Sequence, residues 1–236
     1  MLRARLREDD VAAHLGVDPK TVRRWLSGRV PYPSSRAALA DLVGADEADL
    51  WPEAGGPLSG RSRPEELAGV YPHRWAIPRD VWACFFESAE QEIDVLAYSA
   101  LFLAEDAGLL GIIEDKARSG VRVRFALGDP DSPSVALRGK EEGIDDAMAA
   151  KIRNALTLYR PLIESGNAEI RLHQTVLYNS IYRSDDQLFV NQHAYSIPAA
   201  HAPVFCFQEF ERRGMATEYI DSLERVWTEA HPLREF

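Results

Sequence analysis

The sequence predicts two domains: a small all-α domain, followed by an α/β domain with a mixed sheet. A length of 236 residues suits two domains better than one. Residues 1–52 show helical apolar spacing, whereas strand and helix patterns alternate over residues 65–236. Between them, residues 53–64 are rich in glycine, proline and serine, which predicts a flexible linker.

Charge is distributed unequally between the two predicted domains. Residues 1–50 contain eight Lys/Arg and eight Asp/Glu, so the whole net charge of −10 belongs to the remainder. From Pro19 to Ala40 there are five basic residues and no acidic residue. The acidic larger domain would repel DNA, whereas this stretch concentrates the cations that phosphate binding requires.

Residues 10–29 predict two short helices joined by a tight turn. Gly16 stands where the first helix must end, because glycine enters the left-handed conformation at little cost. Asp18 can cap the second helix, and Pro19 fits its first position. Such a helix-turn-helix places its second helix in the DNA major groove. The predicted DNA-binding residues are Lys20, Thr21, Arg23, Arg24, Ser27 and Arg29. The alternative is a helical hairpin with a solvated basic face.

The rest of the small domain also reads as helical. Residues 2–7 predict a short first helix, Ser34 or Ser35 is expected to cap a helix that Gly44 closes, and residues 46–51 predict a last short helix. The motif Leu15-Gly-Val-Asp-Pro-Lys-Thr-Val-Arg-Arg-Trp-Leu-Ser-Gly-Arg29, then Pro-x-Pro and Leu-Ala-x-Leu-Val-Gly-Ala, resembles the lambda-repressor-like domain of xenobiotic-response-element (XRE) family regulators. This resemblance implies a compact domain that binds double-stranded operator DNA as a dimer.

The larger domain alternates helix and strand patterns. Helices are predicted over residues 79–91, 109–118, 145–163 and 217–230, and strands over 93–98, 121–127, 169–172, 179–183, 188–193 and 203–207. The unit from 93 to 127 predicts a parallel crossover, because parallel neighbours need a long connection. Residues 184–187 predict the turn of a hairpin.

This element order resembles one half of a phospholipase D-like fold. That family carries a motif His-x-Lys-x4-Asp-x6-Gly-Ser-x-Asn, whose histidine is the nucleophile. Aligning Asp185 with the family aspartate places Tyr178 at the histidine, Ser180 at the lysine, and residues 192–195 at Gly-Ser-x-Asn. A tyrosine is neutral at pH 7 and is a poor nucleophile in place of imidazole. The resemblance therefore implies the fold without its phosphodiesterase chemistry, and no catalytic residue, metal site or cofactor is predicted.

The position of the lost motif still predicts a ligand pocket. Tyr178 and Ser180 are two residues apart on a strand and so face one side, and the next strand repeats this spacing. Ligands bind beyond the carboxyl ends of strands in open α/β sheets, and basic residues there suit an anion. The predicted ligand-binding residues are Asp129, Arg138, His173, Tyr178, Ser180, Asn191, His193 and Tyr195. The alternative for each is an ordinary hydrogen-bonding or loop residue.

These patterns predict a sequence-specific transcriptional regulator. The expected protein is a homodimer whose phospholipase D-like domain dimerises and senses a small, anionic effector. One alternative is a phosphodiesterase or nuclease that uses His173 or His193, and another is a larger domain that only dimerises the DNA-binding ends.

No signal peptide or membrane-spanning run is visible. Cys84 and Cys206 stand among apolar residues and predict buried free thiols, which suits a bacterial cytoplasm.

Overall fold

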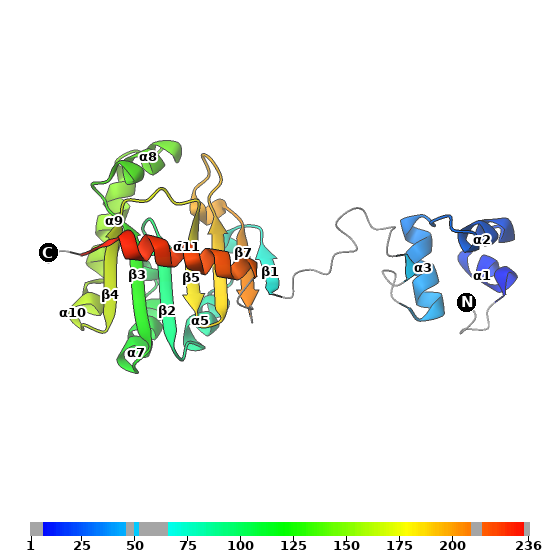
Figure 1. Ribbon diagram of the computed structural model, residues 1–236, viewed down its shortest axis with the longest axis horizontal. Helices are drawn as coiled ribbons and strands as arrows, with labels where there is room; N and C mark the ends of the chain where they lie inside the picture. Colours follow the sequence, from blue (N-terminus) through cyan, green and yellow to red (C-terminus); the bar gives the residue numbers. More distant parts are fainter. Residues whose placement is uncertain (1–6, 46–49, 52–65, 209–213, 234–236) are drawn as a thin grey trace. The chain divides into compact units, whose positions relative to one another are not determined.

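The structure is a computed structural model that describes residues 7–45, 50–51, 66–208 and 214–233. The chain divides into two compact units, residues 1–63 and 64–236, which we call the helical unit and the α/β unit (Figure 1). Most of the predicted helix over residues 2–7, most of that over 46–51, and the linker at 53–64 lie outside the described residues. The predicted fold class, a small helical part followed by an α/β part with a mixed sheet, is confirmed.

Three helices of the helical unit are described: α1 (Glu8–Leu15), α2 (Pro19–Leu26) and α3 (Pro33–Val43). The predicted turn is confirmed. Gly16 ends α1 at φ 63°, and the Asp18 side chain accepts a hydrogen bond of 2.8 Å from the backbone N–H of Lys20. Tyr32, and neither predicted serine, is the N-cap of α3, because Pro33 fits the first helical position. A small core contains Val11, Ala12, Val22 and Leu39.

The α/β unit is built on an eight-stranded mixed sheet in the order β1-β7-β6-β5-β2-β3-β4-β8. The strands are β1 (Leu67–Tyr71), β2 (Glu92–Ala97), β3 (Arg122–Gly128), β4 (Ala168–His173), β5 (Asn179–Ser184), β6 (Gln187–Gln192), β7 (Val204–Gln208) and β8 (His231–Pro232). β2 and β3 are parallel neighbours, as predicted; β3 and β4 are also parallel, and the other pairs are antiparallel. The predicted β5–β6 hairpin is confirmed, with Ser184 opposite Gln187. β1 and β8 were not predicted.

Helices cover the sheet. They are α5 (Arg79–Glu87), α6 (Leu101–Glu105), α7 (Ala107–Arg118), α8 (Pro133–Glu141), α9 (Ala147–Leu158), α10 (Arg160–Glu164) and α11 (Met215–Glu229), with the short 3-10 helices η1 (Arg74–Ala76) and η2 (Ala199–His201). The single helix predicted over 145–163 is wrong: α9 ends at Leu158, and α10 begins at Arg160. Pro161 explains the break, because proline in a helix interior removes a hydrogen bond and clashes with the preceding turn.

A buried ion-pair network joins α11, which lies across one face of the sheet in Figure 1, to β2 and β3. The guanidinium of Arg124 donates to both carboxylate oxygens of Asp94, at 2.6 and 2.9 Å, and also to Glu224 of α11. Asp94 is fully buried, and Arg124 is nearly so. Burial alone would lower the pKa of Arg124, but its hydrogen bonds to the carboxylates of Asp94 and Glu224 raise that pKa above its ordinary value. The guanidinium therefore stays charged inside the fold.

The two cysteines differ in exposure. Cys206 is buried in β7, as predicted, whereas Cys84 is exposed, so the prediction for that thiol is wrong. The reason is helical geometry: α5 buries Trp82, Phe85 and Phe86, and Cys84 lies off that face. Among the described helices, none has the length and apolar character that crossing a membrane would need.

Candidate functional site

The first candidate site is the exposed face of α2. Lys20, Arg23, Arg24 and Ser27 follow the spacing i, i+3, i+4 and i+7, which places them on one side of the helix. All four residues are exposed, while Val22 of the same helix is fully buried in the small core. The helix therefore holds its polar stripe in solvent by packing its opposite side.

The charged side chains of this stripe form few contacts with the other described residues of the helical unit. Arg23 donates to Glu8 of α1, with Nε and Oε2 2.7 Å apart, in a pair whose arginine side chain is 67% exposed. The Ser27 hydroxyl donates to the backbone carbonyl of Arg24. Lys20, Arg24 and Arg29 form no ion pair within the described part of the chain. Thr21 is half-buried, and Arg29 is exposed beyond the end of α2.

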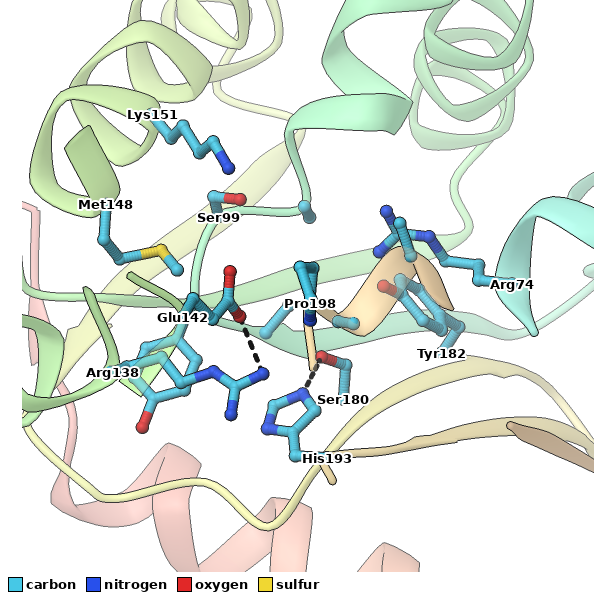
Figure 2. Close-up of a pocket in the computed structure, with 15 residues that line it drawn as sticks. Arg74, Ser99, Arg138, Glu142, Met148, Lys151, Ser180, Tyr182, His193 and Pro198 are labelled. Atoms are coloured by element: carbon cyan, nitrogen blue, oxygen red, sulfur yellow. Dashed lines mark hydrogen bonds and ion pairs between the residues drawn. The ribbon is translucent and has the colours of Figure 1, made fainter. Parts of the chain in front are cut away.

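The second candidate site is a cavity of about 100 Å³ in the α/β unit (Figure 2). It is lined by the end of β2 and the residues after it, by β5, by His193 after β6, and by residues in or next to α8, α9, η1 and η2. The polar lining residues are Arg74, Ser99, Arg138, Glu142, Lys151, Ser180 and His193. Three of the eight predicted ligand-binding residues, Arg138, Ser180 and His193, are thus brought together here.

Ser180 of β5 and His193, the residue after β6, form a hydrogen-bonded pair. The Ser180 Oγ and His193 Nε2 are 3.0 Å apart, and His193 Nδ1 is 3.1 Å from the carbonyl oxygen of Leu177. A carbonyl can only accept, so Nδ1 carries the proton, and Nε2 of the neutral ring accepts from the Ser180 hydroxyl. Burial, followed by the nearby charge of Arg138, lowers the pKa of His193 to about 4. The imidazole is therefore neutral at pH 7, in a single tautomer.

The charged side chains of the cavity carry an excess of positive charge. Arg138 is buried and pairs with Glu142 at 2.6 Å, while it also donates to the backbone carbonyl of Ile197. Glu141 lies further from Arg138, at 3.6 Å. Neither Arg74 nor Lys151 forms an ion pair with another described residue. In Figure 2, Arg74 lies at one end of the cavity, and Arg138 and Lys151 lie at the other.

The hydroxyl of Tyr182 is a further polar group of the cavity lining. Its ring is fully buried, it lines the cavity, and its hydroxyl has no hydrogen-bond partner among the described residues. Buried polar groups are nearly always satisfied, so an orphan beside a cavity indicates a missing partner. Figure 2 shows the Tyr182 ring beside Arg74.

Two predicted residues lie near the cavity without lining it. His173, at the end of β4, is buried, and its Nε2 is 3.3 Å from the carbonyl oxygen of Ala97; burial lowers the pKa of His173 to about 4. Its ring packs beside Tyr98, which stacks on His193. The amide nitrogen of Asn191 donates to the carbonyls of Ala202 and Pro203, so it fixes the approach to β7.

The remaining three predicted residues are placed elsewhere. Asp129 stabilises the loop after β3, because its carboxylate accepts from the backbone of Asp131 and from the side chain of Gln174. Tyr178 precedes β5, which begins at Asn179, and its side chain is 79% exposed. Tyr195 follows β6 and is 81% exposed. Both tyrosines lie outside the strands, Tyr178 before β5 and Tyr195 after β6. Strand alternation therefore does not place their side chains on the same face as Ser180.

Asp185, the residue aligned with the family aspartate, has a structural role. It occupies the turn between β5 and β6 at φ 51°. Its carboxylate accepts backbone hydrogen bonds from Glu90, Gln91 and Glu92, at 2.6, 2.9 and 2.8 Å. These bonds attach the hairpin turn to the segment that leads into β2, the strand that pairs with β5.

Sequence reasoning missed Arg74, Lys151 and Glu142. Glu142 could have been found, because it stands four residues after Arg138 and so meets it on one face of a helix. Arg74 and Lys151 come from η1 and α9, and no local pattern connects them with β5 or β6. Only the fold brings them to the cavity.

Comparison with known proteins finds no matching protein-family model and no matching curated protein. Among solved structures, the chain is similar to the archaeal chromatin protein TrmBL2, described as showing a novel mode of DNA binding, with 14% identity and a TM-score of 0.46. It is also similar to the phospholipase D family member Nuc from Salmonella typhimurium, with 15% identity and a TM-score of 0.41. A third similar structure is phosphatidylserine synthase from Haemophilus influenzae, with 16% identity and a TM-score of 0.38.

The alignments differ in extent. They cover 91%, 71% and 65% of this chain, respectively. This chain spans 66% of the length of the chromatin protein, 96% of Nuc and 36% of the synthase.

Proposed function

We propose that this protein is a DNA-binding transcriptional regulator of XRE type. It acts as a cytoplasmic homodimer, and its phospholipase D-like α/β unit senses a small anionic effector. The DNA-binding residues are Lys20, Thr21, Arg23, Arg24, Ser27 and Arg29. The observation that carries the proposal is the exposed cationic stripe of α2, held in solvent by a helix-turn-helix with the expected caps.

The stripe suits duplex DNA for a geometric and an electrostatic reason. A short helix with its cations on one side fits the major groove, where arginine and lysine contact base edges and phosphates. The pair between Arg23 and Glu8 is exposed, so transferring Arg23 to a phosphate costs little. In a dimer, two such helices would contact half-sites about 34–36 Å apart, or a multiple of that distance.

The experiment selects genomic fragments with the purified full-length protein and then measures affinity by gel shift at fixed salt. Replacing both Arg23 and Arg24 by alanine should weaken binding at least about 30-fold, since two contacts of about 1–3 kcal/mol each sum to at least about 2 kcal/mol. The matched control removes two exposed arginines from the α/β unit, Arg118→Ala with Arg153→Ala, and should leave affinity nearly unchanged. Equal losses in both variants would contradict a role specific to α2.

The cavity carries the proposed effector site. Arg74, Arg138 and Lys151 face one small space in which Glu142 is the acidic lining residue, and the neutral pair Ser180–His193 adds polar atoms without charge. A cavity of about 100 Å³ lies below the range of about 300–1,000 Å³ that is usual for pockets that hold a whole ligand. This size and charge favour a phosphate or carboxylate group.

Binding of inorganic phosphate and pyrophosphate to the full-length protein, measured by calorimetry and thermal shift, tests the effector site. A ligand of the native state must raise the unfolding temperature. Lys151→Ala should weaken binding about ten-fold, the value of one charge-assisted hydrogen bond. Arg153→Ala, which removes an exposed charge from the same helix, serves as the control. A thermal shift that Lys151→Ala leaves intact would contradict this site.

A second candidate function is an enzyme, and the contact between Ser180 and His193 favours it. A hydroxyl hydrogen-bonded to a neutral imidazole, which a third group orients, is the arrangement of an activated nucleophile. Turnover of a chromogenic phosphodiester that disappears in both Ser180→Ala and His193→Ala would support an enzyme. Turnover that persists in both variants would contradict it.

A further inference from the structure

A second, larger cavity of about 370 Å³ adjoins the first. Its volume lies within the range of about 300–1,000 Å³ that is usual for ligand pockets. Trp75, Trp82 and Phe102 give it aromatic walls, and Ile77 and Leu109 add apolar surface. At its polar end, Arg79 and Asp106 neutralise each other through two hydrogen bonds of 2.7 and 2.9 Å. The remaining charge on its wall is that of Arg74.

Arg74 lines both cavities, so the two share this side chain. That group lies over the ring of Phe102, with its central carbon 4.1 Å from the ring centroid. A cation–π contact holds the guanidinium plane against an aromatic wall without neutralising its charge. The charge of Arg74 can therefore attract an anion in the first cavity, while its guanidinium plane packs on Phe102, which lines the second cavity.

The two cavities also share aromatic packing. Phe102 and Trp82 line the larger cavity, and both contact Tyr182, which lines the smaller one, at centroid distances of 5.7 and 5.0 Å. Trp75 remains 74% exposed at the larger cavity, and its ring lies parallel to that of His201 in η2. An indole that is left in water beside an aromatic pocket offers a large flat surface to a ring-shaped ligand.

We propose that the effector is a planar aromatic ring that bears an anionic group, the chemistry of a nucleoside monophosphate. The anionic group lies in the small cavity, between Arg74, Arg138 and Lys151, and the ring lies in the larger one, against the exposed ring of Trp75 and beside Phe102. This inference rests on the proposed effector site and adds to it the chemical class of the ligand. The size of the small cavity supports it, because about 100 Å³ lies well below the range of about 300–1,000 Å³ that is usual for whole-ligand pockets.

Paired ligands test the inference by calorimetry on the full-length protein. Each pair has the same anion with and without a ring: adenosine 5′-monophosphate and uridine 5′-monophosphate against ribose 5-phosphate, and phenyl phosphate against inorganic phosphate. In at least one pair the aromatic member should bind about ten-fold more tightly, a gain of about 1.4 kcal/mol. Trp75→Ala should abolish that gain and leave the ring-free anions unaffected. Val70→Ala, at another exposed apolar residue of the unit, is the control.

The outcomes separate the two proposals. If every ring-free anion binds as tightly as its aromatic partner, the aromatic class is wrong and the anion site stands. If no anion binds, both are wrong. If an aromatic anion gains affinity that survives Trp75→Ala and Phe102→Leu, the ring does not occupy the larger cavity, and the assignment fails.

Discussion

The helical unit and the α/β unit use arginine in opposite ways. In the helical unit, Arg23 pairs with Glu8 at 2.7 Å, and its side chain is 67% exposed. In the α/β unit, Arg124 pairs with Asp94 at 2.6 Å, and its side chain is 7% exposed. The distances are nearly equal, but an exposed pair contributes about 0–1 kcal/mol, whereas breaking a buried pair costs about 3–5 kcal/mol. Exposure, and not distance, therefore decides which cations a polyanion can recruit.

The largest expected effect follows from breaking the buried pair. Asp94→Asn leaves the Arg124 guanidinium buried with half of its carboxylate partners, and should lower the free energy of unfolding by about 3–5 kcal/mol. Urea unfolding followed by circular dichroism measures it, and hydrogen exchange assigns the loss to the α/β unit. A change below about 1 kcal/mol would show that Glu224 alone satisfies Arg124, and the contrast between the units would disappear.

A smaller loss is expected at the hairpin turn. Asp185→Asn removes the charge from a carboxylate that accepts three backbone hydrogen bonds, and asparagine still tolerates the positive φ. Hydrogen bonds to charged groups contribute about 1.5–3 kcal/mol, so we expect a loss of about 2–3 kcal/mol. Asp186→Asn, at the exposed neighbouring position, is the matched control. Equal free energies of unfolding for the two variants would contradict the structural role inferred for Asp185.

Acid should destabilise the α/β unit first. His173 and His193 each have a folded pKa of about 4, below the ordinary value of 6.5. Between these values the unfolded chain binds more protons, so stability present above pH 6.5 is lost as the pH falls toward 4. The expected slope is about 1.4 kcal/mol per pH unit for each histidine. Hydrogen exchange at pH 6 and pH 5 should show the loss in the α/β unit, and equal protection at the two pH values would contradict it.

The smallest expected effect belongs to the exposed pair. Glu8→Gln removes the partner of Arg23 and should change the free energy of unfolding by less than about 1 kcal/mol. The same variant should retain or increase DNA affinity, because it frees a cation of the proposed interface. A large destabilisation would mean that this pair belongs to the fold of the helical unit, and the distinction from Arg124 would then fail.

Sequence patterns predicted the elements whose signals are local. The turn at Gly16, Asp18 and Pro19 depends on backbone preferences of those residues alone, and the β5–β6 hairpin depends on period-two alternation around a polar turn. The patterns failed where the signal is short or tertiary. β1 has five residues at the edge of the sheet, and α6 has five residues after a left-handed Ala100.

The candidate site shows the same division. Ser180 and His193 were found because a predicted hairpin brings its two strands side by side; Ser180 lies in β5, and His193 directly follows β6. Arg74 and Lys151 were not found, because their approach depends on how η1 and α9 pack on the sheet. The prediction for Tyr178 and Tyr195 extended the strand alternation too far, because β5 begins at Asn179 and β6 ends at Gln192.

Because the His193 ring is neutral near pH 7, the cavity does not respond to pH through this residue. Since the pKa of that ring is about 4, the imidazole adds no charge at any pH from 6 to 8. A response transmitted from this cavity would thus follow the amount of effector in the cell, with any drift across neutrality coming from the effector's own acid–base equilibrium.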